Sequence, residues 1–394
     1  MNLRADTRNK PTWPKGNASQ KKTDISFQLQ LRQLYPGSAK HPVRPSQQPK
    51  TLKQLTVKFV AKGPPSQDHT VWLRQFPQQS GVWSNCSFVF DPEAEQYDWL
   101  VVYDDLPRSS EERFSNRAEK LSCKRENTLL ITTEPSSVKH YSKPFLMQFG
   151  HVLSSQEPRF IDHPNAIFSQ TGLHWFYGIG KHGKGRQTVV TYDELKAAKV
   201  PEKPRLISTV CSSKKQKRSL HNTRYQFTEA LKSSLPDFAH YGHGIEVIAD
   251  KADALDPFKY HIAIENHACK HHWTEKLSDP FLGFCLPFYF GCPNLDDYFP
   301  QDSYVYIDLF DLEQSKEVIL TAINDNYFEK RLSAISEARR LILDEYNLFA
   351  LISKIIEDKH VPSTTPPSNE TILSRRACKM KHPIASLLYS FKQR

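Results

Sequence analysis

The sequence predicts an α/β protein with two consecutive domains, each built around a mainly parallel β-sheet, and three observations support this class. Short apolar runs typical of buried strands recur along the chain, and the segments between them can hold crossover helices. These runs stand on both sides of a polar stretch at 191–204 that contains two prolines, as linkers often do. The 394 residues are enough for two cores. Two such domains imply a ligand-binding cleft between them.

The first predicted domain covers residues 54–190. Residues 55–61 alternate apolar and polar side chains, which is typical of a strand with one buried face. Further apolar runs that we interpret as strands occupy 88–91, 97–107, 129–135 and 144–150.

The second predicted domain covers residues 205–360. Its apolar runs are interpreted as strands at 205–213, 259–266, 286–291 and 303–310. Segments with amphipathic spacing or a capping residue predict helices at 223–235, 274–282, 315–325 and 329–358. In the last segment apolar residues recur every three or four positions without a break, which predicts one long helix that closes the domain.

The two ends of the chain carry more positive charge than the net charge of +10, because the region between them is net negative. Residues 1–53, rich in Pro, Gln, Lys and Ser, are predicted to be a disordered basic extension. Residues 361–394 form a basic tail in which cationic and apolar residues mix, a composition that suits either peripheral contact with an anionic membrane or a disordered tail. The region between the tails is net acidic, so we expect no nucleic-acid partner, because a nucleic-acid-binding core normally carries a basic face.

The apolar runs and the cysteines bear on location. No run of 18 or more apolar residues occurs, and residues 1–16 lack the apolar stretch of a signal peptide. The seven cysteines are irregularly spaced and include no Cys-x-x-Cys pair. We therefore expect reduced thiols in a cytoplasmic protein, peripheral on the inner face of a membrane if the tail binds one.

The segment 261–300 concentrates polar residues in a way that favours a ligand site. An apolar strand runs into a loop that begins with Glu265 and Asn266, and Thr274 then stands where it can cap a new helix. Free N–H groups at a helix start favour an anion, and they disfavour a lysine such as Lys276 unless an anionic ligand is present. A nucleotide diphosphate fits these requirements, with Glu275 able to accept hydrogen bonds from both ribose hydroxyls.

This segment resembles the donor-binding signature of glycosyltransferase family 10, the α-1,3/1,4-fucosyltransferases. The resemblance covers about forty residues in order and at compatible spacing, and it is weaker elsewhere. The matching residues are Ile264-Glu265-Asn266, His272-Trp273-Thr274-Glu275-Lys276-Leu277, Pro287-Phe288-Tyr289-Phe290-Gly291-Cys292-Pro293, Tyr298-Phe299-Pro300 and Ser303-Tyr304-Val305. The resemblance implies the GT-B fold, in which two Rossmann-like domains face each other across a cleft, and a donor, GDP-fucose, bound by the second domain.

Carried over residue by residue, the resemblance assigns five donor-binding candidates. Glu275 resembles the glutamate that holds the ribose, and Lys276 the lysine on the pyrophosphate. Asn266 resembles the asparagine that closes the donor pocket, and Arg224 an arginine at a helix start that also contacts the pyrophosphate. His272 stands where the family usually has tyrosine, which leaves the detail of the donor contacts open.

The chemistry implied is inverting transfer of fucose to a hydroxyl of an acceptor glycan, such as a surface polysaccharide or lipopolysaccharide. No Asp-x-Asp motif occurs, so we expect no metal and no cofactor, with cationic side chains stabilising the leaving pyrophosphate. Glu134, at the end of the predicted strand in the segment 129–135, resembles the family's catalytic base. The carboxylates that compete with it for this role are Glu93, Glu95, Asp104 and Asp105.

Two alternatives stay open from the sequence. The same scaffold can use another nucleotide sugar, because the motif identifies the nucleotide and phosphates better than the sugar. A non-catalytic protein associated with a membrane or nucleic acid would instead depend on the basic tails. The acceptor, the linkage position and the oligomeric state have no sequence pattern.

Overall fold

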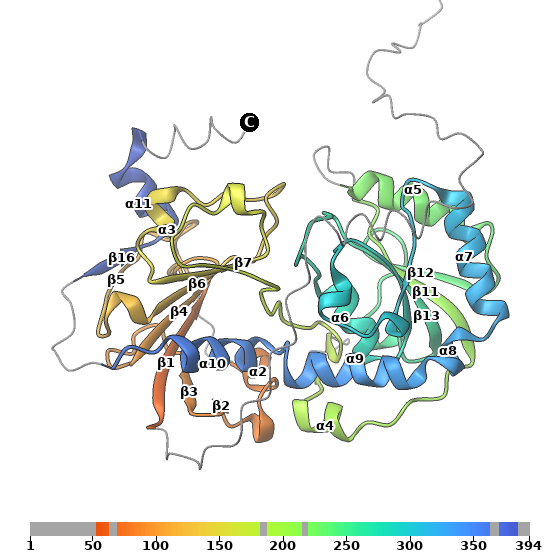
Figure 1. Ribbon diagram of the computed structural model, residues 1–394, viewed down its shortest axis with the longest axis horizontal. Helices are drawn as coiled ribbons and strands as arrows, with labels where there is room; N and C mark the ends of the chain where they lie inside the picture. The colour runs from red at the N-terminus through yellow and green to blue at the C-terminus, as the bar shows by residue number, and fades with distance from the viewer. Residues whose placement is uncertain (1–52, 63–68, 182–186, 215–219, 363–369, 385–394) are drawn as a thin grey trace, which may run out of the picture. The chain divides into compact units, whose positions relative to one another are not determined.

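The computed structural model describes residues 53–62, 69–181, 187–214, 220–362 and 370–384, and these residues contain two separate parallel sheets (Figure 1). The predicted N-terminal extension therefore lies outside the described residues, apart from Lys53. The predicted α/β class, with two Rossmann-like halves, is confirmed.

The first sheet has seven strands in the order β2-β3-β1-β4-β6-β7-β8. Every neighbouring pair is parallel except β2 with β3. The strands are β1 (Leu55–Ala61), β2 (Val82–Trp83), β3 (Cys86–Val89), β4 (Trp99–Tyr103), β6 (Thr128–Ile131), β7 (His151–Ser154) and β8 (Ala166–Phe168).

The second sheet has five strands, all parallel, in the order β12-β11-β13-β14-β15. They are β11 (Arg205–Val210), β12 (Phe238–Tyr241), β13 (Phe258–Ile264), β14 (Leu286–Phe290) and β15 (Val305–Tyr306). In both sheets the first long parallel strand lies between the second and the third, so successive connections leave it in opposite directions. Ligands of such sheets bind at this switch point, beyond the carboxyl ends of the strands.

Helices flank the two sheets (Figure 1). The α-helices are α2 (Thr70–Leu73), α3 (Lys143–Leu146), α4 (Tyr192–Ala197), α5 (His221–Lys232), α6 (Glu275–Leu282), α7 (Leu312–Asn324), α8 (Tyr327–Lys330), α9 (Leu332–Asp344), α10 (Leu348–Lys359) and α11 (Arg375–Lys381). Short 3₁₀ helices span Pro77–Gln79, Arg125–Asn127, Pro158–Phe160, Lys251–Ala254, Leu295–Asp297 and Gln301–Ser303. Two small antiparallel ribbons pair β9 (Ile179–Lys181) with β10 (Gln187–Val189), and β5 (Ala118–Lys120) with β16 (Thr371–Leu373).

The central strands are apolar on both faces, which is why their sequences read as continuous apolar runs. All five residues of β4 are buried. Val101 and Tyr103 pack into the core on one side of the sheet, and Leu100 and Val102 into the core on the other. This alternation follows from the two-residue period of a strand.

Residues 144–150 are not the strand that the sequence predicts. Residues 143–146 form α3, which begins with a proline in its first turn, and the strand β7 follows it at 151–154. A short apolar run gives no period by which a strand can be told from a buried helix, and proline is favoured in the first helical turn.

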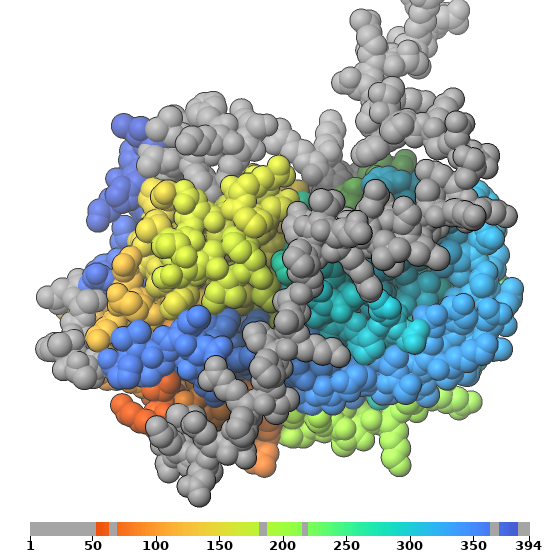
Figure 2. Space-filling view, viewed as in Figure 1, coloured from red at the N-terminus to blue at the C-terminus, as the bar shows by residue number. Residues whose placement is uncertain are grey.

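The single long helix predicted at 329–358 is also wrong, because the chain breaks between α9 and α10. Asn347 adopts an extended conformation there, and its side-chain oxygen accepts a hydrogen bond from the Phe349 N–H at 2.9 Å. Its side-chain amide donates to the Gln75 carbonyl at 2.9 Å. The apolar stripe of α9 packs into the second sheet's core, whereas that of α10 packs into the first sheet's core. In Figure 2 the blue surfaces of these helices adjoin the layers of both sheets.

The prediction of a disordered C-terminal tail is wrong for residues 371–381. Strand β16 pairs with β5, and α11 follows with Ser374 as its N-cap. Ile372 and Cys378 are buried in one core of the first sheet. Residues 385–394 lie outside the described residues. Within the described ranges no helix is both long enough and apolar enough to cross a bilayer.

Candidate active site

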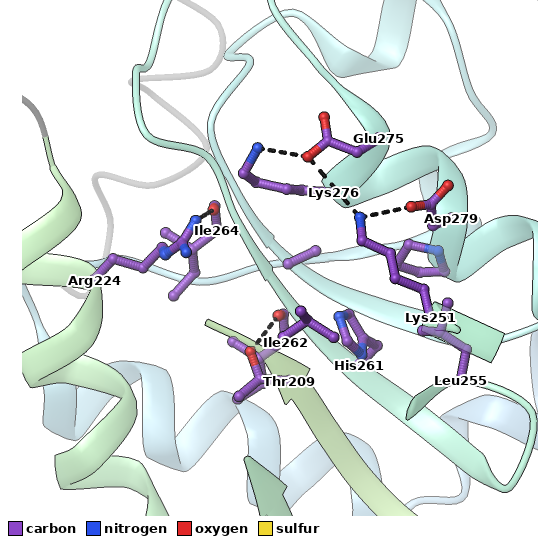
Figure 3. Close-up of a pocket in the computed structure, with 13 residues that line it drawn as sticks. Thr209, Arg224, Lys251, Leu255, His261, Ile262, Ile264, Glu275, Lys276 and Asp279 are labelled. Carbon is purple, nitrogen blue, oxygen red and sulfur yellow. Dashed lines mark hydrogen bonds and ion pairs between the residues drawn. The ribbon is translucent and has the colours of Figure 1, made fainter. Parts of the chain in front are cut away.

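A pocket lies at the switch point of the second sheet, where β11 and β13 end (Figure 3). The walls include Thr209 and Val210 from β11 and Ile262 to Ile264 from β13. The lining also includes five residues with charged side chains, Arg224, Lys251, Glu275, Lys276 and Asp279. Three predicted donor-binding residues, Arg224, Glu275 and Lys276, are therefore brought together by the fold.

The start of α6 is built around a buried carboxylate. Glu265, at the carboxyl end of β13, is 1% exposed and accepts hydrogen bonds from the Thr274 N–H at 2.8 Å and from its hydroxyl at 2.8 Å. Thr274 caps the helix, as predicted, because its hydroxyl oxygen accepts from the Lys276 N–H at 3.3 Å. A side chain at Gly291 would collide with Glu265. The glycine of the Phe-Gly-Cys-Pro segment thus leaves room for this carboxylate.

Lys276 and Lys251 share the carboxylates of α6. The Lys276 ammonium lies 2.9 Å from Glu275, and the Lys251 ammonium lies 2.7 Å from Asp279 and 3.9 Å from Glu275. Burial opposes ionisation of Glu275, but the two lysines outweigh it and hold its pKa below the usual range. Burial also disfavours the charged form of Lys276, yet Glu275 and Glu265 raise its pKa. Both members of the central pair therefore stay charged at neutral pH.

Arg224 is a buried cation without a carboxylate partner among the described residues. It lies in the first turn of α5 and is 6% exposed. The guanidinium donates to the Asn266 side-chain oxygen at 2.9 Å, to the Ile264 carbonyl at 3.2 Å and to the Cys211 sulfur at 3.3 Å. The amide and the carbonyl are uncharged, and His240 together with Arg224 lowers the pKa of the Cys211 thiol against the effect of its burial. Because burying an unpaired charge is costly, this arrangement favours an anionic ligand between Arg224 and Lys276.

Asn266 holds Arg224 in place but is not one of the residues that line the pocket. His272 is not in the pocket lining either: it is 4% exposed, and its Nδ1 lies 3.0 Å from the Ser155 hydroxyl, in the loop after β7. Burial, together with His267 and Lys276, lowers its pKa to about 3, so the ring is neutral. The structure thus places His272 in a contact between the two sheet regions rather than against the pocket.

Glu134 is an exposed residue that follows β6 at the carboxyl end of the first sheet. Its backbone carbonyl accepts a hydrogen bond from Gln156 at 2.7 Å. Partial burial and the charge of Asp104 raise the pKa of Glu134, while Lys139, Lys62 and Lys276 oppose the rise. The influence of Lys276 means that Glu134 lies within electrostatic range of the pocket in the second sheet.

The competing carboxylates are engaged elsewhere or exposed. Asp104 forms an ion pair with Lys139 and accepts a hydrogen bond from Tyr141. Asp105 accepts from the Arg375 N–H at 2.9 Å, and Glu93 pairs with Arg117 at 2.7 Å. Glu95 is exposed.

Residues 200–329, which contain every element of this pocket, match the sequence model of "Glycosyltransferase family 10 (fucosyltransferase) C-term". This segment is similar in sequence to the C-terminal domain of the family 10 glycosyltransferases. The resemblance noted from the motifs 264–305 is thereby confirmed.

Relatives of the family 10 domain include α-(1,3)-fucosyltransferase B of Drosophila melanogaster, which is 36% identical over 73 residues. That match spans 18% of this chain and 16% of the fly protein. A solved α1,3-fucosyltransferase with GDP-fucose aligns over 77% of this chain and 96% of its own, at 14% identity and a TM-score of 0.43. The structure of TarM aligns over 59% of this chain and 54% of its own, at 10% identity and a TM-score of 0.38.

Sequence reasoning missed two charged residues of the family 10 pocket, Lys251 and Asp279. Lys251 begins a 3₁₀ helix in the connection between β12 and β13, where no motif marks it. Asp279 had a detectable signal. It stands four positions after Glu275 on α6, and like charges at this spacing destabilise a helix unless a cation lies between them. Lys251 is that cation.

Proposed function

We propose that the chain transfers fucose from GDP-fucose to a hydroxyl of an acceptor glycan, with inversion and without a metal. The observation that carries this proposal is the buried guanidinium of Arg224, which lacks a carboxylate partner in the described residues and lies in the same pocket as Lys276. The pocket lies in the segment that matches the family 10 model, and the Drosophila relative is called an α-(1,3)-fucosyltransferase.

In this proposal the pyrophosphate binds between Arg224 and Lys276. Arginine offers a two-pronged donor to phosphate oxygens, and lysine adds a point charge. Glu275, kept ionised by its lysine neighbours, accepts hydrogen bonds from the ribose hydroxyls. Asn266 and the Ile264 carbonyl fix the guanidinium before the ligand arrives, which reduces the cost of ordering it.

The transfer step requires a base on the opposite side of the sugar. Glu134 takes the proton of the acceptor hydroxyl while that oxygen bonds to the anomeric carbon. The bond from the anomeric carbon to the phosphate oxygen breaks at the same time, and GDP leaves with its electron pair. One direct displacement inverts the anomeric carbon. The raised pKa of Glu134 suits it to accept this proton.

Transfer of a different sugar from a nucleotide is the second candidate. His272, which stands where the family usually has tyrosine, motivates it, because this departure from the family pattern leaves the detail of the donor contacts open. The buried position of His272 against Ser155 means that such a change acts through the shape of the loop 265–274 rather than through direct contact with the lined pocket.

A peripheral contact with an anionic membrane is proposed as well. Around α11, a pocket with a volume of about 1000 Å³ is lined by Arg108, Arg113, Arg375, Arg376 and Lys379, none of which forms an ion pair within the described ranges. Met380 and Ile384 are 66% and 73% exposed beside them. Cations next to exposed apolar side chains favour an anionic bilayer surface. Binding to vesicles with and without anionic lipid tests this contact, and equal binding to both would contradict it.

Turnover of a panel of donors tests the proposed reaction. The full chain is incubated with GDP-fucose, GDP-mannose and UDP-galactose, with and without added Mn²⁺, and release of the nucleotide is measured. We expect release from GDP-fucose alone, at a rate that added Mn²⁺ does not change. Turnover of another donor would support the second candidate, and a reaction that requires added Mn²⁺ would contradict a metal-independent transfer.

A further inference from the structure

A cluster of three metal-ligating side chains lies outside the pocket, where the loop after β7 meets the loop after β13. Glu157 comes from the first loop, and His267 and Cys269 come from the second. One ligand atom from each of the three lies within 4.8 Å of the other two. The proposed transfer reaction uses none of these residues.

The imidazole of His267 lacks a partner that its position requires. Its Nε2 is buried, has no hydrogen-bond partner among the described residues and lies 3.9 Å from the Glu157 carboxylate. A buried polar nitrogen without a partner is unfavourable, so such atoms normally face a water or an ion. The Cys269 thiol is also buried, and it donates a hydrogen bond to the Ser155 carbonyl at 3.4 Å.

The Glu157 carboxylate is oriented as a metal ligand would be. One oxygen accepts a hydrogen bond from the buried Ser136 hydroxyl at 2.7 Å, which leaves the other oxygen turned toward His267. Ligating carboxylates in metal sites are commonly held by such a second partner. Arg159 lies 3.7 Å from the same oxygen, but its side chain is 75% exposed and free to leave.

We propose that Glu157, His267 and Cys269 bind a zinc ion that joins the two loops. One oxygen, one nitrogen and one sulfur ligand suit zinc, whereas magnesium and calcium prefer oxygen alone. Ligands around a tetrahedral zinc lie about 3.4–3.8 Å apart, so the three side chains need to close by about 1 Å. Three protein ligands leave a fourth position for water.

A zinc ion at this position would fix the distance between the loop after β7 and the loop after β13. The loop 265–272 carries Asn266, which holds Arg224, and the loop after β7 carries Gln156, which binds the Glu134 carbonyl. A zinc ion between these loops would set the separation of Arg224 and Glu134 without touching the substrate. The sequence did not reveal this ligand set, because Glu157 lies far from the other two residues along the chain and follows no motif.

Metal content and thermal unfolding of the full chain test the zinc site without reference to catalysis. The purified protein is mixed with Zn²⁺, freed of excess ion and analysed by mass spectrometry for metals. We expect about one zinc per chain, a higher Tm with zinc than with EDTA, and loss of both effects in Cys269→Ser. The matched control is Cys123→Ser, which removes a buried thiol that also faces a backbone carbonyl, at 3.6 Å.

Two further measurements keep the test decisive if Cys269→Ser fails to fold. Co²⁺ added to the wild-type chain is expected to give a sulfur-to-cobalt absorption band, and Ser136→Ala is expected to weaken zinc binding about 10- to 100-fold. Wild-type protein without bound zinc, or zinc retained in folded Cys269→Ser, would overturn the proposal. Loss of fucosyl transfer with zinc binding intact would instead contradict the proposed function alone.

Discussion

The two sheets have the same strand order around their first strands, but their carboxyl ends carry different kinds of surface. The second sheet ends in a buried pocket. Its lysines pair with the carboxylates of α6, whereas Arg224 donates to the Asn266 side chain and has no carboxylate partner in the described residues. The first sheet ends in an exposed carboxylate, Glu134, beside the buried pair of Asp104 and Lys139. The same topology thus ends in a buried, charged pocket in one sheet and in an exposed carboxylate in the other.

The largest effect is expected at the open side. Glu134→Gln keeps the size of the side chain but removes its ability to accept a proton, so we expect kcat to fall about 10²- to 10⁴-fold. The affinity for GDP should stay unchanged, because the donor pocket lies in the other sheet. Steady-state rates and nucleotide titrations measure the two quantities. Glu95→Gln is the matched control, and an equal loss of activity in the control would remove the distinction between the two carboxylates.

The next largest effect is expected at Lys251, whose charge should contribute both to the stability of the fold and to the affinity for GDP. Lys251→Met leaves Asp279, which is 1% exposed, without its ion-pair partner, so we expect a loss of about 1–3 kcal/mol in the free energy of unfolding. We also expect GDP to bind about tenfold more weakly because a nearby cation is gone.

The double variant Lys251→Met, Asp279→Asn separates these two effects. Neutralising the orphaned carboxylate should recover most of the stability but not the affinity for GDP. Denaturant unfolding and calorimetric titration measure them separately. If the affinity returned with the stability, Lys251 would act through the fold rather than through its charge.

A smaller effect is expected where α9 ends and α10 begins. Asn347→Ala removes the cap of α10 and the bond to the Gln75 carbonyl, so we expect the free energy of unfolding to fall by about 1–2 kcal/mol. Asp311→Ala, which removes the cap of α7 on an exposed segment, is the control and should cost less. Chemical denaturation measures the free energy of unfolding of both variants. Equal losses would mean that Asn347 contributes no more than an ordinary cap.

The smallest effect concerns pH. Transfer requires ionised Glu134, so kcat/KM should fall as the pH drops below the pKa of this residue. Partial burial and Asp104 raise that pKa, so the fall begins at a higher pH than for an ordinary glutamate. Asp104→Asn removes a neighbouring negative charge and should move the fall to lower pH. A pH–rate profile that does not move would show that Asp104 has no influence on the base.

The residues that line the pocket of the second sheet could be predicted only in part from the sequence. Glu275 and Lys276 stand together in one motif at a predicted helix start, whereas Arg224 lies about fifty residues earlier and was indicated only by the family resemblance. Lys251 and Glu157 act across long stretches of chain and follow no motif. The break at Asn347 was invisible, because the apolar period continues through it while the stripe changes from one core to the other.

Calorimetric titration of the wild-type chain and of Lys276→Ala with GDP, UDP and CMP, in the absence of metal, tests the central claim most directly. Lys259→Ala, which removes a lysine of β13 that pairs with Glu329 away from the pocket, serves as the control. We predict preferential binding of GDP by the wild type and the control, and its loss in Lys276→Ala. Absence of nucleotide binding by the wild type, or unchanged GDP binding by Lys276→Ala, would contradict a pyrophosphate site between Arg224 and Lys276.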